Sequence, residues 1–148
     1  MLEKLKNIIF IIFLGGVLLV FNHIVDSTFI TTFLKKDLIT ILIALLAINI
    51  TTFSVILTSI NSIKKEFKCN FKNTIKEMKK SITEQVLHII IAVMIISMME
   101  SVLFKYSHQY IKIIVETCLT SVFVAALFNL HDTAASVFII SEHDESDE

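Results

Sequence analysis

Four long apolar stretches constrain this chain more than any motif in it. They cover residues 8–25, 38–60, 86–104 and 111–140. A helix needs about 20 residues to cross the hydrocarbon core of a bilayer, and each stretch is close to that length or exceeds it. Hydrophobic residues make up 55% of the 148 residues, and a soluble domain would expose so much of this surface that it would aggregate. The sequence predicts an all-α, integral membrane four-helix bundle forming one domain.

The fourth apolar stretch is longer than a bilayer requires. His131 and Asp132 interrupt it, so we expect the span itself to cover 111–131, the pair to mark the inner membrane surface, and a short helix to follow. A His–Asp pair also assists nucleophiles in enzymes, but no Ser or Cys stands where it would complete such a site.

The distribution of lysine predicts the orientation of the bundle. All 13 basic residues are lysines; nine precede the first span or lie between the second and third, and four lie in the other two connections, at Lys35, Lys36, Lys105 and Lys112. Basic residues accumulate on the cytoplasmic side. We therefore expect both termini and the segment 61–85 to be cytoplasmic, in a multi-pass protein of the bacterial inner (cytoplasmic) membrane.

The second span carries the most regular pattern of the chain. Small and weakly polar residues recur at alternating spacings of four and three, at Thr40, Ala44, Ala47, Thr51, Ser54 and Thr58. Small residues allow membrane helices to approach closely. The stripe predicts either a packing seam, within the chain or between copies, or the pore-lining face of a homo-oligomer. Asn49 lies off the stripe and is a candidate for a second polar contact.

The segment 61–85 combines an apolar repeat with a concentration of basic residues. Its lysines, candidates for binding lipid or a protein partner, are Lys64, Lys65, Lys68, Lys72, Lys76, Lys79 and Lys80. The pattern predicts one amphipathic helix, or two that are broken near 70–73. Such a segment either lies on the anionic leaflet or extends spans two and three into the cytoplasm as a hairpin whose apolar stripe packs against other subunits. We favour the hairpin. Nucleic acid is disfavoured as a partner, because arginine is missing.

A capping box is also recognisable at the end of this segment. Ser81 is followed three residues later by Glu84, a pair that typically begins a helix. We therefore expect the third span to start there.

Two carboxylates lie inside the last two apolar stretches. A charged group at the bilayer centre is costly, so Glu100 and Glu116 are functional candidates. Both are eight residues from His108, which places them at similar depth in an antiparallel hairpin. They either bind a cation, share a proton or form a charged ring, or they extend towards Lys105 and Lys112 at the outer surface.

Catalytic and metal-binding patterns are not found. Cys69 and Cys118 lie in a basic loop and an apolar helix, so we expect free thiols, no metal and no cofactor. No nucleophile has a base beside it, and we do not expect an enzyme. Proline is absent, which disfavours the broken helices of transporters; Gly15-Gly16 is the expected flexible point.

The chain resembles, in architecture, the small four-span membrane proteins of bacterial anti-phage (phage-exclusion) systems. The shared features are its size, its four spans, the run ITILIALLAINITTFSVILTSI at 39–60 and the basic segment that follows. This resemblance implies a membrane-perturbing effector or a membrane anchor for a partner, and it transfers no functional residue. Small multidrug transporters have a similar size but differ in having a carboxylate in span one and in their glycine, proline and tryptophan content.

Two functions therefore compete. The first is an oligomeric membrane effector that conducts ions or depolarises the membrane, with span two or the two glutamates lining the path. The second is a non-conducting anchor that recruits a cytoplasmic protein through its lysine-rich segment and its acidic tail, residues 141–148.

Overall fold

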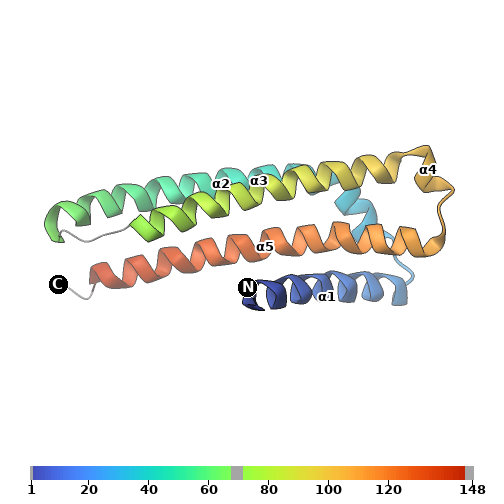
Figure 1. Ribbon diagram of the computed structural model, residues 1–148, viewed down its shortest axis with the longest axis horizontal. Coiled ribbons are helices and arrows are strands. Elements are labelled where there is room, and N and C mark those ends of the chain that lie inside the picture. Colours follow the sequence, from blue (N-terminus) through green and yellow to red (C-terminus); the bar gives the residue numbers. More distant parts are fainter. Residues whose placement is uncertain (1, 68–71, 146–148) are drawn as a thin grey trace.

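The fold is a bundle of long helices, which confirms the all-α prediction (Figure 1). The computed structural model describes the backbone of residues 2–67 and 72–145, and the side chains of 5–58 and 75–135. Within these residues the elements are α1 (Leu2–Ile24), α2 (Phe29–Phe67), α3 (Lys72–Glu100), the single turn α4 (Val102–Lys105) and α5 (Gln109–Glu145).

Four of these helices are long and apolar enough to cross a membrane. Their apolar parts within the described residues are Leu5–Ile24, Phe29–Thr58, Ile75–Glu100 and Gln109–Ala135. Large apolar side chains cover the outside of the bundle, among them Phe13, Phe21, Val55, Met94 and Ile114. A surface of this composition suits a bilayer and would be unstable in water, as expected of a multi-pass membrane protein.

The connection between α1 and α2 is a tight turn fixed by hydrogen bonds. Asp26 adopts a left-handed backbone conformation with a φ of 49°, which asparagine and aspartate tolerate better than other non-glycine residues. The backbone N–H of Ser27 donates to the carbonyl of Asn22, at 2.9 Å. The hydroxyl of Ser27 then accepts from the backbone N–H of Phe29, at 3.0 Å, and so caps the start of α2.

The third span ends earlier than its apolar stretch, which we had expected to continue to 104. Ser101 has an extended backbone, with φ −69° and ψ 151°, and its hydroxyl accepts from the N–H of Phe104 to begin α4. A serine in this position offers the backbone a cap in place of another helical turn. The chain therefore turns at 101–108, where Tyr106 and Tyr110 are exposed.

The capping box predicted at Ser81 was wrong. α3 already begins at Lys72, and Ser81 lies inside it. The hydroxyl of Thr83 donates back to the carbonyl of Lys79, at 2.9 Å, as hydroxyls in helix interiors do. The helix continues through this point because Met78 and Ile82 pack against Phe53 and Ile56 of α2, which stabilises the turns that precede Ser81.

The segment 61–85 is divided between two helices. α2 continues to Phe67 and α3 begins at Lys72, while the expected break near 70–73 falls partly on 68–71, which lie outside the described residues. The two helices run side by side as a hairpin (Figure 1), and the apolar residues Met78 and Ile82 pack against α2 of the same chain. α5 likewise passes His131 without a break and continues to Glu145, so no separate short helix follows the fourth span.

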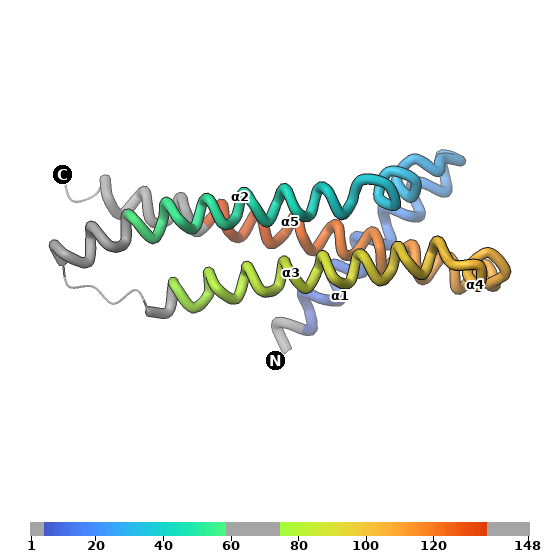
Figure 2. The backbone as a smooth tube through the Cα atoms, turned by 90° about the horizontal axis from the view of Figure 1, so that it is seen from above, coloured from blue at the N-terminus to red at the C-terminus, as the bar shows by residue number. Residues whose placement is uncertain are grey.

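The main core lies between α2, α3 and α5. It contains Leu34, Leu38, Leu42, Leu45, Ala92, Met99, Val115, Leu119, Val122 and Ala126. α1 packs chiefly along α5 and accompanies only part of its length (Figure 1). Figure 2 shows the same bundle from above, with α2 and α3 running antiparallel beside α5.

Gly15-Gly16 is not a flexible point, because α1 passes through both residues as continuous helix. Gly15 instead allows close packing: a Cβ placed there would lie 2.4 Å from the Oγ of Ser121 and 2.9 Å from its backbone nitrogen. The hydroxyl of Thr120 also donates to the carbonyl of Gly15, at 3.1 Å. The glycine is therefore needed for the contact between α1 and α5.

Candidate functional site

The small-residue stripe of α2 lies on the surface of the bundle. All six of its residues, which we call the α2 stripe, are exposed: Thr40, Ala44, Ala47, Thr51, Ser54 and Thr58. Residues of a helix are separated by about 100° each, so Leu38, Leu42, Asn49 and Ile56 lie on the opposite face, where they are buried. The stripe is thus not a packing seam within the chain.

Three of the four hydroxyls of the stripe are paired within α2 itself. Thr51 donates to the carbonyl of Ala47, at 2.9 Å, and Ser54 donates to that of Ile50, also at 2.9 Å. Thr58 donates to the carbonyl of Ser54, at 3.0 Å. Because these donors are already paired, the face can contact lipid or another helix without exposing an unpaired polar group.

The stripe is also bordered by larger side chains. Ile43, Ile48, Ile50, Val55 and Leu57 are exposed on α2 and lie on either side of it. Small residues between two rows of branched ones form a shallow depression, the arrangement into which a second helix packs closely.

Glu100 and Glu116 both lie near the end of the bundle formed by the turn at 25–28 and by α4. The carboxylate of Glu100 pairs with Lys35 of α2, with Nζ and Oε1 2.9 Å apart, rather than with Lys105. Glu116 lies on α5, and the positive charges of Lys35 and Lys112 both interact with its carboxylate. The lysines and glutamates therefore form one mixed charge cluster at this end of the bundle.

The described core offers no path for ions through one chain. Leu38, Leu42 and Leu119 are fully buried at its centre, and side chains from α2, α3 and α5 fill the space between these helices. An ion path formed by this protein would therefore have to run between copies.

The lysine-rich segment is described only in part. Lys76, Lys79 and Lys80 are exposed on α3, whereas Lys68 and the side chains of Lys64, Lys65 and Lys72 lie outside the described residues. Lys80 is paired with Glu77, at 3.1 Å, and lies 3.8 Å from Glu84.

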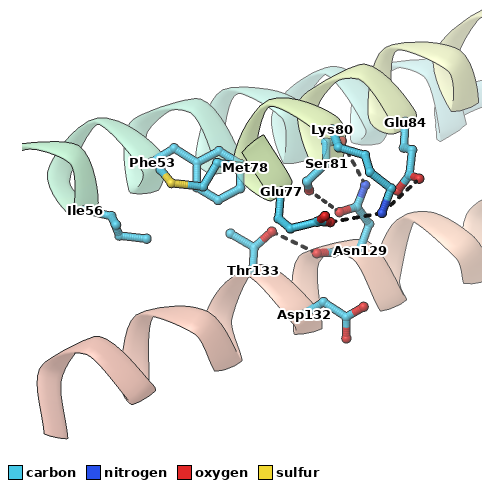
Figure 3. A pocket seen from close by; sticks show the side chains of 10 residues that line it. All are labelled: Phe53, Ile56, Glu77, Met78, Lys80, Ser81, Glu84, Asn129, Asp132 and Thr133. Atoms are coloured by element: carbon cyan, nitrogen blue, oxygen red, sulfur yellow. Dashed lines mark hydrogen bonds and ion pairs between the residues drawn. The ribbon is translucent and has the colours of Figure 1, made fainter. Parts of the chain in front are cut away.

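A cavity of about 360 Å³ opens beside Lys80 (Figure 3). Its apolar side is formed by Phe53, Ile56 and Met78, and charged residues border the rest. Asn129 of α5 joins α3 there: its amide donates to the carbonyl of Ser81, at 3.2 Å, and its side-chain oxygen accepts from the hydroxyl of Ser81. His131 and Asp132 lie nearby and are exposed, with Nδ1 and Oδ1 3.5 Å apart.

A buried polar pair joins α2 to α3. From the sequence we expected Asn49 to make a polar contact, but we did not identify its partner, Gln85. Asn49 donates a hydrogen bond to Gln85, and both side chains are fully buried. The remaining oxygen of Asn49 and the remaining nitrogen of Gln85 have no partner among the described residues. Gln85 was identifiable, since it is an amide at the start of an apolar run, one helical turn after Ser81.

Comparison of the chain with known protein families, with curated proteins and with solved structures found no match. The function is therefore argued from the molecule itself.

Proposed function

We propose that this chain is an oligomeric effector of the bacterial inner membrane, in which copies associate along the α2 stripe and the ion path runs between them. The observation that carries the proposal is the position of the stripe. Six small or weakly polar residues, spaced over 18 positions, all face outwards, opposite the face that packs into the core.

Physical chemistry favours a helix partner on this face over lipid alone. In a membrane the hydrophobic effect does not hold helices together, and association depends on close van der Waals contact, which small residues permit. The two alanines and three internally paired hydroxyls allow that approach. A ring of such faces also supplies weakly polar atoms along the axis of an oligomer, although without a charged ring it would discriminate poorly between ions.

The test is to replace Ala47, at the centre of the stripe, by leucine. Because Ala47 is exposed in one chain, Ala47→Leu should leave the helical fold intact while preventing close approach of a second helix. Overpacking of about 1–2 kcal/mol corresponds to roughly tenfold weaker association. Subunit number in nanodiscs, measured by photobleaching, and ion flux from liposomes should both fall.

Ala134→Leu is the matched control, because Ala134 is an exposed alanine on α5 and receives the same side chain. It should leave subunit number and flux unchanged. A monomeric wild-type protein, or Ala47→Leu with unaltered assembly, would contradict the proposal.

A non-conducting anchor is the second candidate, and the charge cluster favours it. Glu100 is engaged by Lys35, as expected of a carboxylate that stabilises the bundle, and α3 carries the exposed lysines Lys76, Lys79 and Lys80. An oligomer that conducts no ions in liposomes would support the anchor over the effector. The resemblance to phage-exclusion membrane proteins extends either proposal to a role in anti-phage defence.

A further inference from the structure

A second, larger cavity lies at the opposite end of the bundle from the chain termini. Its volume is about 590 Å³, and it is bordered by α1, α2, α5 and the turn at 25–28, together with Met99 of α3 and Phe104 of α4. This size is within the range of sites that hold small organic groups. It lies where α1, which packs chiefly along α5, meets the first turns of α2 and α5.

The charged residues around this cavity differ in whether they already have an ion-pair or hydrogen-bond partner. Lys35 is paired with Glu100, and the ammonium of Lys112 donates to the carbonyl of Lys105, at 3.2 Å. The carboxylate of Glu116, in contrast, has no ion pair or hydrogen-bond donor that the structure shows within the described residues. It lies seven residues into α5, about 10 Å from the start of the helix, where an unpaired charge is costly in a bilayer.

The cavity has both a polar and an apolar side. The imidazole of His23, at the end of α1, and the hydroxyl of Ser27, in the connection between α1 and α2, border the cavity near the charged residues. Leu19 and Val20 of α1 and Ile113 of α5 form the other side. A group bound here would therefore be polar at one end and have alkyl chains at the other.

The sum of the charges indicates which headgroup fits. Lys35, Lys112 and Glu116 border the cavity, and Lys35 is already neutralised by Glu100. The two remaining charges, on Lys112 and Glu116, sum to zero, so a zwitterion adds no net charge to the site. Because the free group is a carboxylate, the ligand needs a cation that donates hydrogen bonds, and Lys112 is placed to face its anion.

We propose that this cavity binds the headgroup of a phospholipid that carries a primary ammonium, as in phosphatidylethanolamine. The ammonium pairs with Glu116, the phosphate lies towards Lys112, and the acyl chains lie along Leu19 and Val20. The site is formed by helices of one chain, so the proposal does not depend on the proposed oligomer.

The experiment measures the thermal unfolding of the purified full-length protein in detergent with three added lipids of matched acyl chains. Phosphatidylethanolamine should raise the unfolding temperature more than phosphatidylcholine, whose trimethylated ammonium donates no hydrogen bonds, and more than phosphatidylglycerol. Glu116→Gln should lower the affinity for phosphatidylethanolamine by about tenfold, the size expected for loss of a charge-assisted hydrogen bond. The other two lipids should act on this variant as on wild type.

Glu77→Gln is the matched control, since Glu77 lies on α3 at the other end of the bundle, and it should retain the wild-type preference. Equal shifts by all three lipids, or an unaltered preference in Glu116→Gln, would overturn the proposal. An equal shift by free phosphoethanolamine would overturn the assignment to a lipid. Mass spectrometry of lipids bound to the wild-type protein gives a test that needs no variant: phosphatidylethanolamine must be enriched over its share of the source membrane.

Discussion

The contact between α1 and α5 depends on the missing side chain of Gly15, and the neighbouring glycine supplies an internal control. A Cβ at Gly15 would lie 2.4 Å from Ser121 Oγ, 2.9 Å from its nitrogen and 3.0 Å from its Cα. Two of these three atoms belong to the backbone, so the clash is relieved only by moving one helix. A Cβ at Gly16 meets no described atom within 4 Å.

The two substitutions share one favourable effect and differ in one unfavourable effect. Replacing glycine by alanine inside a helix stabilises it by about 0.5–1 kcal/mol, and this gain applies to both positions. Overpacking costs about 1–3 kcal/mol and applies to Gly15 alone. The helix-propensity gain cancels when the free energies of unfolding of the two variants are compared. Gly15→Ala should therefore be less stable than Gly16→Ala by about 1–3 kcal/mol.

The assay is reversible unfolding in mixed micelles at increasing SDS, followed by far-UV circular dichroism for wild type and both variants. Ser121→Ala removes the nearest atom, so it should recover part of the loss when combined with Gly15→Ala, but not all, because the backbone contacts remain. Equal stability of the two glycine variants would refute the argument that Gly15 is required by close packing.

Two further predictions concern polar contacts in the bundle. Gln85→Leu should destabilise the protein by about 1–2 kcal/mol, because it leaves the buried amide of Asn49 unpaired; the double variant with Asn49→Leu should lose less than the sum of the single variants, and additive losses in SDS unfolding would contradict the pairing. Asn129→Ala removes both contacts with Ser81 and should reduce the hydrogen-exchange protection of α3 around residues 80–84, whereas His131→Ala, at an exposed side chain, should not.

The fold was largely predictable because the membrane imposes it. Length and apolar composition suffice to identify four helices, since the hydrocarbon core permits few other structures. The boundaries were less predictable, because the stronger local signal was misleading: Ser81 is followed by Glu84 in a capping box, whereas Ser101 has Phe104 at that position. Ser101 ends a helix, whereas Ser81 lies inside one, and the difference comes from packing of Met78 and Ile82 against α2, which no local pattern reveals.

For the candidate sites, patterns within one helix were predictable from the sequence, whereas contacts between helices were not. The period of the α2 stripe was readable in the sequence, as was the polar character of Asn49. The partners were not: Glu100 had Lys105 near it in sequence, but the structure pairs it with Lys35, 65 positions away. Pairing across helices depends on their relative register, which the sequence of each helix leaves open.

Polar groups that already have a hydrogen-bond or ion-pair partner, and those that lack one, occupy different parts of this protein and suit different kinds of contact. Along the α2 stripe the hydroxyls of Thr51, Ser54 and Thr58 are paired internally, so that face is suited to contact with another helix. Glu116 is in the opposite situation: it is charged, lies within an apolar helix, and borders a cavity. An unpaired charge in a membrane needs a partner and a paired hydroxyl does not. For this reason we propose assembly along α2 and ligand binding at the cavity. A variant of Ala47 should therefore change subunit number without changing lipid preference, and a variant of Glu116 should do the reverse.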